Sequence, residues 1–345
     1  MPRCKKLFNF GNDTIDIVER YKYLGVILNE HLDYSKSADL LAGASGRALS
    51  GVISKFKFFR NVGYESFRKM YYTSVVPILD YCSGVWGFSK HECCEKIQLR
   101  ACRYFLGIHQ KAPIGAIIGD MGWQDCQKRR HLEMIRLWNR LMKLDQNRIT
   151  RIVFDWDHEL CHNNWSSEVK TLFSESGKID VFNDKLQCNL NEMQNYLDEK
   201  MQTEWSEYVK EKPKLGTYIQ FKSKIDTEDY VKYCMSRQQR SFLAQIRAGI
   251  LPLHIETGRF QGKEEKDRVC KVCNTDAIES EFHFICKCEK YLIIRQDMYS
   301  SVSNEHFVNL NDNEKFIFLL SNEWKKVAIF IEKAWKIRHY ILYQD

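Results

Sequence analysis

The chain has 345 residues and a net charge of +7, with 44% hydrophobic and 28% charged residues. This composition is typical of a globular protein and excludes wholesale disorder. No apolar run approaches the ~20 residues that a membrane-spanning helix needs. Because no secretory signal is recognisable at the N-terminus, we expect an intracellular protein without membrane contact, in the nucleus or the cytoplasm. Its thirteen cysteines should then be thiols or metal ligands.

The basic charge is concentrated in the first part of the chain. Residues 1–150 hold 24 Lys and Arg against 14 Asp and Glu, whereas residues 151–200 hold 5 against 10. A basic N-terminal part suits a polyanionic partner, although many domains without such a partner are equally basic.

Strand signals come first in the chain. Residues 5–10, 14–18 and 21–28 are rich in β-formers or alternate in polarity, and Gly11-Asn12-Asp13 is a turn signal. They predict a three-stranded meander, or a hairpin plus one strand, which is too little sheet to be stable alone.

Apolar residues then recur at helical spacing, so we expect a mainly α protein. The predicted helices cover residues 35–56, 65 to about 77, 91–106, 113–118, 125–145, 190–211, 226–248, 289–299, 314–320 and 324–343. Between them, residues 151–200 are weakly periodic, and Asp155-Trp156-Asp157-His158 is expected to be a loop. Residues 252–268 are expected to be a connector, and we find no internal repeat.

The sharpest local motif is Cys270-Lys271-Val272-Cys273, followed by His283 and Cys288. A Cys-x-x-Cys pair and a later His/Cys pair can grip the two edges of a tetrahedral zinc ion. Four protein ligands leave no open position, which indicates a structural site. Cys286 is a rival fourth ligand, although it leaves only two residues after His283. In the alternative interpretation, all of these cysteines are ordinary thiols.

Two segments, 55–60 and 100–105, interleave basic and aromatic residues. Their basic members are Lys55, Lys57, Arg60, Arg100 and Arg103. Lys and Arg can pair with phosphates while aromatic rings stack on bases. Periodicity alone favours another interpretation, in which the aromatic residues are core and the charges are the solvated face of the same helices.

Motifs for catalysis are largely missing from the sequence. It has no phosphate-binding Gly-x-x-x-x-Gly-Lys loop, no Gly-x-Ser-x-Gly elbow and no His-Glu-x-x-His pair. Asp155 and Asp157 could hold Mg²⁺, but an acidic surface segment is the simpler interpretation. The isolated His109, His131 and His254, and the helical Cys93, Cys94 and Cys102, are expected to be structural.

Several segments resemble, in family order, the region that follows the catalytic palm of LINE-type (non-long-terminal-repeat) retrotransposon reverse transcriptases. They are residues 17–26 with Tyr23-Leu24-Gly25, residues 71–81, 84–87, 97–107 and 251–260, and the Cys/His segment 270–291. The resemblance covers nearly the whole chain, is weakest across about 155–235, and favours Cys288 over Cys286.

The resemblance implies a fragment of an RNA-directed DNA polymerase without its catalytic centre. The family's polymerase holds two Mg²⁺ ions with palm carboxylates that include an aromatic-x-Asp-Asp turn. This sequence lacks that turn and begins after its place, so we expect no catalytic residue and no bound Mg²⁺. The implied domains are a palm-terminal β-hairpin (1–33), a helical thumb-like domain (34–150), a helical connector domain (151–255), a Cys/His module (256–300) and C-terminal helices (301–345).

The implied partner is RNA or an RNA/DNA template–primer. Tyr23, Leu24 and Gly25 would form a primer-grip-like hairpin. The basic residues expected to bind the polyanion are Lys22, Lys55, Lys57, Arg60, Arg100, Arg103, Arg129 and Arg130. Two alternatives stay open. The chain could be an inert relic or a repurposed protein-interaction module, or it could be the C-terminal part of an active enzyme whose palm and fingers lie upstream of Met1.

Overall fold

The computed structural model describes residues 8–29, 31, 33–58, 63–273 and 275–343. The protein is mainly helical, with 66% helix and 5% strand, as the sequence predicted. Two compact units form, each from three chain segments. Unit 1 comprises Met1–Arg47, Val76–Glu95 and Cys126–Met193; unit 2 comprises Ala48–Val75, Lys96–Asp125 and Gln194–Asp345. The domains expected from the sequence are consecutive stretches of chain, unlike these units, and the limits of those domains stay a prediction.

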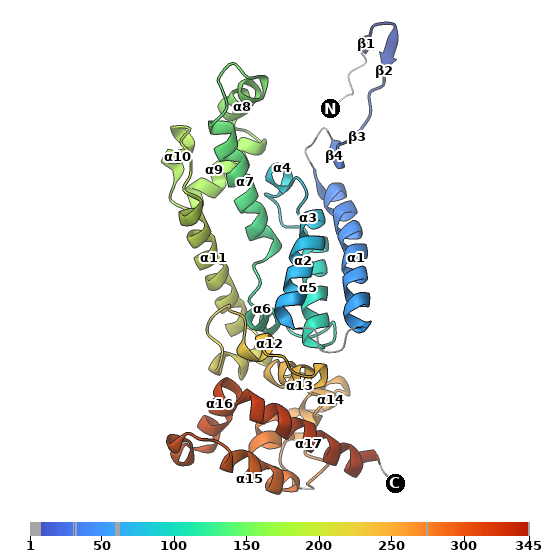
Figure 1. Cartoon of the computed structure of the whole chain (residues 1–345), viewed down its shortest axis with the longest axis vertical. Helices are drawn as coiled ribbons and strands as arrows, with labels where there is room; N and C mark the ends of the chain where they lie inside the picture. Colours follow the sequence, from blue (N-terminus) through green and yellow to red (C-terminus); the bar gives the residue numbers. More distant parts are fainter. Residues whose placement is uncertain (1–7, 30, 32, 59–62, 274, 344–345) are drawn as a thin grey trace. The chain divides into compact units, whose positions relative to one another are not determined.

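The elements of the two units alternate along the chain (Figure 1). Those of unit 1 are β1 (Phe8–Phe10), β2 (Asp13–Ile15), β3 (Arg20–Tyr23), β4 (Val26–Asn29), α3 (Val76–Leu79), α4 (Ser83–Trp86), α7 (Cys126–Met142), α8 (Ile149–Leu160), α9 (Trp165–Glu175) and α10 (Ile179–Asn183). Those of unit 2 are α2 (Tyr64–Ser74), α6 (Ile114–Met121), α12 (Asp229–Lys232), α13 (Arg237–Arg247), α14 (His254–Phe260), α15 (Leu292–Ser300), α16 (Asp312–Asn322) and α17 (Trp324–Tyr343). Three helices contribute residues to both: α1 (Ser35–Phe58), α5 (Glu92–Leu106) and α11 (Leu190–Lys210).

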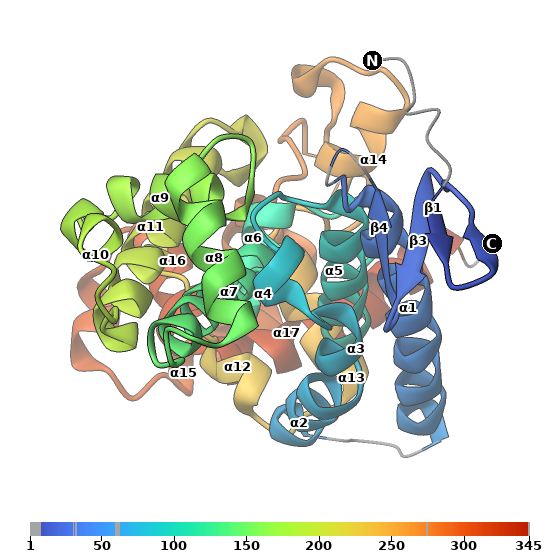
Figure 2. The ribbon, with the colours of Figure 1, turned by 90° about the horizontal axis from the view of Figure 1, so that it is seen from above.

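The N-terminal strands form two separate antiparallel hairpins, β1–β2 and β3–β4, in place of the predicted meander or hairpin plus one strand. The segment expected to be one strand over 21–28 folds back at Leu24 and Gly25, whose φ angles are 44° and 91°. Glycine adopts such an angle without strain, which makes a tight turn possible here. In Figure 2 the β3–β4 hairpin lies at the N-terminal end of α1. The Ile27 amide donates to Ser37 Oγ (2.7 Å), which donates back to the Ile27 carbonyl (3.1 Å).

Most predicted helices are confirmed, and three predictions are wrong. The helix expected over 226–248 is broken into α12 and α13, and the expected connector 252–268 contains α14. Residues 155–158, expected to be a loop, belong to α8. The buried face of α8 includes Arg151 and the half-buried His158 beside Phe154. These polar residues on the buried side obscured the helix in the sequence.

Aromatic side chains form the core of unit 1. Trp138 on α7 is fully buried and contacts Phe154, Phe173 and Phe182, with ring centroids 5.3–5.5 Å apart. Its indole N–H donates to the Leu186 carbonyl at 2.8 Å, so the polar edge of the ring is also satisfied.

Unit 2 contains a buried polar cluster around Asp120 of α6. Its carboxylate accepts hydrogen bonds from the hydroxyls of Tyr218 (2.8 Å) and Tyr230 (2.7 Å) and two from the Arg247 guanidinium (3.0 Å each). Close approach to α6 depends on Gly119, where a Cβ atom would lie 2.3 Å from the Tyr218 hydroxyl. Among the described residues, no helix is both long and apolar enough to cross a membrane.

Candidate metal centre

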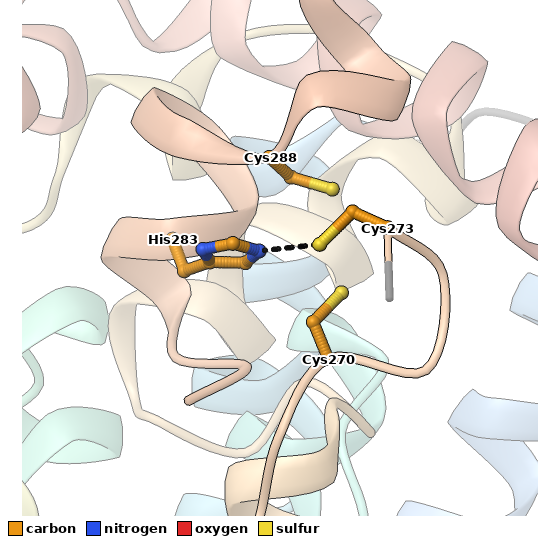
Figure 3. A group of neighbouring side chains, drawn as sticks. All are labelled: Cys270, Cys273, His283 and Cys288. Carbon is orange, nitrogen blue, oxygen red and sulfur yellow. Dashed lines mark hydrogen bonds between the residues drawn. The ribbon is translucent and has the colours of Figure 1, made fainter. Parts of the chain in front are cut away.

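The first two candidate ligands lie on a short hairpin-like loop of unit 2. Val269 and Ile278 form an antiparallel bridge, and the Cys270 amide donates to the Ala277 carbonyl at 2.8 Å. Cys270 and Cys273 follow this bridge, and the two residues between them allow both thiols to face the same side (Figure 3).

The other two candidate ligands are positioned by a π-helical turn, His283–Lys287. The Cys288 amide donates to the His283 carbonyl at 2.8 Å, which is the i→i+5 bond that defines such a turn. Because of this wider turn, the side chains of His283 and Cys288 both point toward the thiols of the loop (Figure 3).

The four ligand atoms of Cys270, Cys273, His283 and Cys288 all lie within 4.8 Å of one another. Cys273 Sγ and His283 Nε2 are 3.5 Å apart. Cys270, His283 and Cys288 are buried, and Cys273 is half-buried. This group, hereafter the Cys/His cluster, could hold one metal ion, as its spacing in the sequence suggested.

Cys286 lies outside the Cys/His cluster. It is buried, and its thiol contacts the Tyr299 hydroxyl. Burial raises the pKa of Cys286 to about 11, which disfavours the thiolate form that binds metals. The structure therefore places Cys288, and not its rival, beside the other three ligands.

Of Cys270 and Cys288, Cys270 is the better prepared to be a thiolate. A hydrogen bond from the Cys288 thiol lowers the pKa of Cys270, and the same contact raises the pKa of Cys288. The Cys270–Cys288 pair therefore loses one proton readily, from Cys270, and retains the other on Cys288. Thiolate is the form in which cysteine coordinates metals.

A buried carboxylate lies directly behind Cys270. Glu279 Oε1 is 3.7 Å from Cys270 Sγ, and Glu279 Oε2 accepts from the His254 amide at 2.6 Å and from Arg338 at 3.1 Å. A second guanidinium, that of Arg295, donates to the Cys288 carbonyl. These bonds connect the Cys/His cluster to α14, α15 and α17, and such outer contacts orient metal ligands.

The predicted grip hairpin is exposed at its tip. Leu24 is 73% exposed, and Lys22 and Tyr23 are also exposed, while Gly25 is half-buried. Tyr81 donates its hydroxyl to the Leu24 carbonyl at 3.0 Å. The turn therefore has a fixed attachment within unit 1 while its side chains face solvent.

The basic residues predicted on α1 and α5 differ in exposure. Lys55, Lys57 and Arg100 are exposed, Arg103 is half-buried, and Arg60 lies outside the described residues. Burial lowers the pKa of Arg103. Arg100 donates to Ser50 Oγ at 2.9 Å, which places part of α5 against α1 within unit 2.

Arg129 and Arg130 are enclosed within unit 1. Arg129 Nε lies 2.8 Å and Arg130 Nε 3.0 Å from the Asp80 carboxylate. Arg130 is 0% exposed and its guanidinium lies over the Trp86 ring, 4.7 Å from the centroid. A guanidinium that is buried and paired in this way is not available to a phosphate, so we do not retain either residue as a binding candidate. Asp80 lies far from both in the sequence, and no local pattern indicates the pairing.

Asp155 and Asp157 have structural partners instead of forming a cation site. Asp155 accepts from Lys185 (2.7 Å) and Arg151 (3.1 Å), and Asp157 accepts from the amide and hydroxyl of Ser166 (3.0 and 2.6 Å). The two carboxylates thus stabilise the helices of unit 1.

No protein-family model, no curated protein and no solved structure matches this chain.

Proposed function

We propose that this chain binds RNA or an RNA/DNA template–primer without catalysing DNA synthesis, as the thumb-like and C-terminal region of a LINE-type reverse transcriptase. The observation that carries the proposal is the β3–β4 hairpin, whose Tyr23-Leu24-Gly25 turn is the segment that most resembles a primer grip. Its side chains are exposed although its backbone is attached to Tyr81. An anchored turn with exposed aromatic and aliphatic side chains suits contact with a nucleic-acid strand.

Exposed basic residues of unit 2 give separate support. Lys55 and Lys57 lie in the last turns of α1 and make no ion pair within the described part of the chain. Unpaired surface lysines can replace the counterions of a phosphate backbone, and the release of these counterions favours binding. We expect the affinity to come largely from such phosphate contacts and to depend little on the base sequence of the nucleic acid.

We further propose that the Cys/His cluster holds zinc in a structural role. Three sulfurs and one imidazole nitrogen are a donor set that zinc prefers among the common divalent ions. A tetrahedron with Zn–S bonds of about 2.3 Å has edges of about 3.8 Å. The 3.5 Å contact between Cys273 and His283 and the 4.8 Å limit on the whole group fit such a tetrahedron after small side-chain movements. The ion would cross-link the loop at Cys270 to the π-helical turn.

The proposal is tested by fluorescence anisotropy with a labelled RNA/DNA hybrid at salt concentrations from about 50 to 200 mM. We expect binding that weakens steeply with salt. The variant Lys55→Ala/Lys57→Ala should bind more weakly and reduce the salt slope by about 2, one for each phosphate contact. Lys266→Ala/Lys336→Ala is the control, because both lysines are 75% exposed but are already paired with Glu264 and Glu332.

Three results would contradict the proposal: no binding at low salt, a flat salt response, or an equal loss in both double variants. Primer extension by the chain alone should be blank, and DNA synthesis would contradict the noncatalytic part. Stable capture of a protein partner without any nucleic-acid binding would favour the interaction-module alternative.

A further inference from the structure

Helix α8 carries an apolar stripe that nothing in the described part of the chain covers. Its members are Ile149 (78% exposed), Val153 (52%), Trp156 (61%) and Leu160 (76%). The spacings of 4, 3 and 4 residues place all four side chains on one narrow side of the helix, with the 3.5-residue period of a coiled-coil seam. Exposed apolar patches of this kind mark interaction surfaces.

The opposite side of α8 is firmly packed into unit 1. Arg151 donates to the Leu141 carbonyl at 3.0 Å, and the rings of Phe154 and Trp138 are 5.5 Å apart. His158 stacks on Phe182 with ring centroids 4.3 Å apart. These contacts fix the rotation of the helix, so the stripe is held facing outward and cannot be buried by turning α8 about its axis.

Two opposite charges lie beside the stripe, at its two ends. Arg148 precedes α8 and Glu159 lies in its last turn; both are exposed, and neither makes an ion pair within the described residues. Eleven residues correspond to almost exactly three helical turns, so both charges lie on the same flank of the stripe.

We propose that α8 pairs with α8 of a second copy of this chain, antiparallel and about a two-fold axis. In this register Ile149 lies opposite Leu160 of the partner subunit, and Val153 lies opposite Trp156 of the partner subunit. Arg148 comes within two residues, about 3 Å along the axis, of the partner's Glu159. The two-fold symmetry produces this charge pair twice, once at each end. A parallel pair would instead bring Arg148 of each copy together and Glu159 of each copy together, which is repulsive.

The contact area between the two α8 helices is small, and this limits the affinity of the dimer. Stable complexes bury about 800 Å² on each partner with 20–30 residues, whereas the seam of α8 offers four apolar side chains and one charge pair at each end. We therefore expect a reversible dimer with a dissociation constant in the micromolar range. The pairing does not depend on nucleic-acid binding.

Sedimentation velocity of the full chain over about 1–200 μM tests the proposal. We expect a monomer–dimer equilibrium that Leu160→Glu weakens at least about tenfold. The matched control is Ile293→Glu on α15, because Ile293 is also 76% exposed and should leave the equilibrium unchanged. Circular dichroism establishes that both variants fold; since both sites are at the surface, neither should perturb the core.

Charge reversal tests the antiparallel orientation. Arg148→Glu alone should weaken the dimer, because the new glutamate then lies near the partner's Glu159 and repels it at both ends of the seam. Adding Glu159→Arg should restore the dimer, since the pair is then reversed and complete. A monomer at every concentration, a dimer unaffected by Leu160→Glu, or a double reversal no better than the single one would overturn the proposal. A hydrogen-exchange map showing α8 protected equally in dilute and concentrated protein would overturn it too.

Discussion

Both compact units of the molecule pack aromatic rings in their cores, but they differ in the polar groups that their interiors hold. Unit 2 uses polar groups that meet in its interior: the Asp120 carboxylate binds two tyrosines and Arg247, and the Cys/His cluster gathers four ligands. Unit 1 relies mainly on the rings packed around Trp138 and on the half-buried Asp80, whose carboxylate is shared by two arginines.

This difference predicts different responses to single substitutions. A buried charge or metal ligand that loses its partner leaves a large desolvation penalty, so unit 2 should respond sharply to changes at a few residues. Packing among rings is distributed over many contacts, so unit 1 should respond more gradually. The three predictions below test this contrast from the largest expected effect to the smallest.

The largest effect is expected from removing a ligand of the Cys/His cluster. Structural zinc contributes about 10–16 kcal/mol of binding free energy at pH 7 in small zinc-binding peptides. Cys288→Ser should therefore abolish stoichiometric zinc and expose the amides of residues 252–300 to hydrogen exchange. Cys286→Ser is the matched control and should retain both the zinc and the protection. Elemental analysis and exchange mass spectrometry measure the two properties; a metal-free wild-type chain that is fully protected would refute the prediction.

The next effect is expected at the Asp120 cluster of unit 2. Arg247→Met removes the guanidinium but leaves the carboxylate buried, so the free energy of unfolding should fall by about 3–5 kcal/mol. The control is Arg136→Met on α7, whose exposed ion pair with Glu133 should contribute under about 1 kcal/mol. Urea unfolding followed by hydrogen exchange distinguishes them. Equal losses would mean that buried polar groups are not what stabilises unit 2.

The smallest effect is expected from pH, in unit 1. Burial lowers the pKa of His158, which stacks on Phe182. Below the ordinary histidine pKa of about 6.5 the unfolded state binds more protons than the folded state, so stability falls as the pH drops further. We expect His158→Phe to reduce the loss of Tm between pH 7.5 and 5.5. The loss of Tm in the variant is compared with the loss of Tm in the wild type, because any effect of acid on the Cys/His cluster is common to both and cancels. An unchanged loss in the variant would contradict the prediction.

The features that the sequence predicted well depend on residues close together in the chain. The spacing of Cys270 and Cys273 was sufficient to suggest a ligand loop, and the apolar period was sufficient to delimit α17. Features that depend on distant residues could not be predicted: nothing near Asp80 indicates that Arg129 and Arg130 will surround it. A run of β-forming residues hid the turn at Leu24 and Gly25, and only the resemblance to a primer grip indicated a hairpin there.

The contrast also explains why residues that bind a nucleic acid are harder to predict from a sequence than metal ligands. A metal site needs convergent ligands, which leave a fixed spacing in the sequence. Lysines that contact phosphates need only be exposed, and exposure depends on the packing of the whole unit. Arg130 and Lys55 have the same charge and both lie on predicted helices, yet Arg130 is buried and Lys55 is exposed.

The π-helical turn at His283–Lys287 has a consequence for how this region can vary. Its hydrogen bond spans five residues, so the turn holds one residue more than an α-helical turn would. Deleting any one residue between His283 and Cys288 would restore ordinary helical spacing and rotate the thiol by about 100° away from its partners. Substitutions within this segment should be tolerated wherever packing allows, but insertions and deletions should not. The length of the segment is therefore expected to be more strictly maintained than its amino-acid identities.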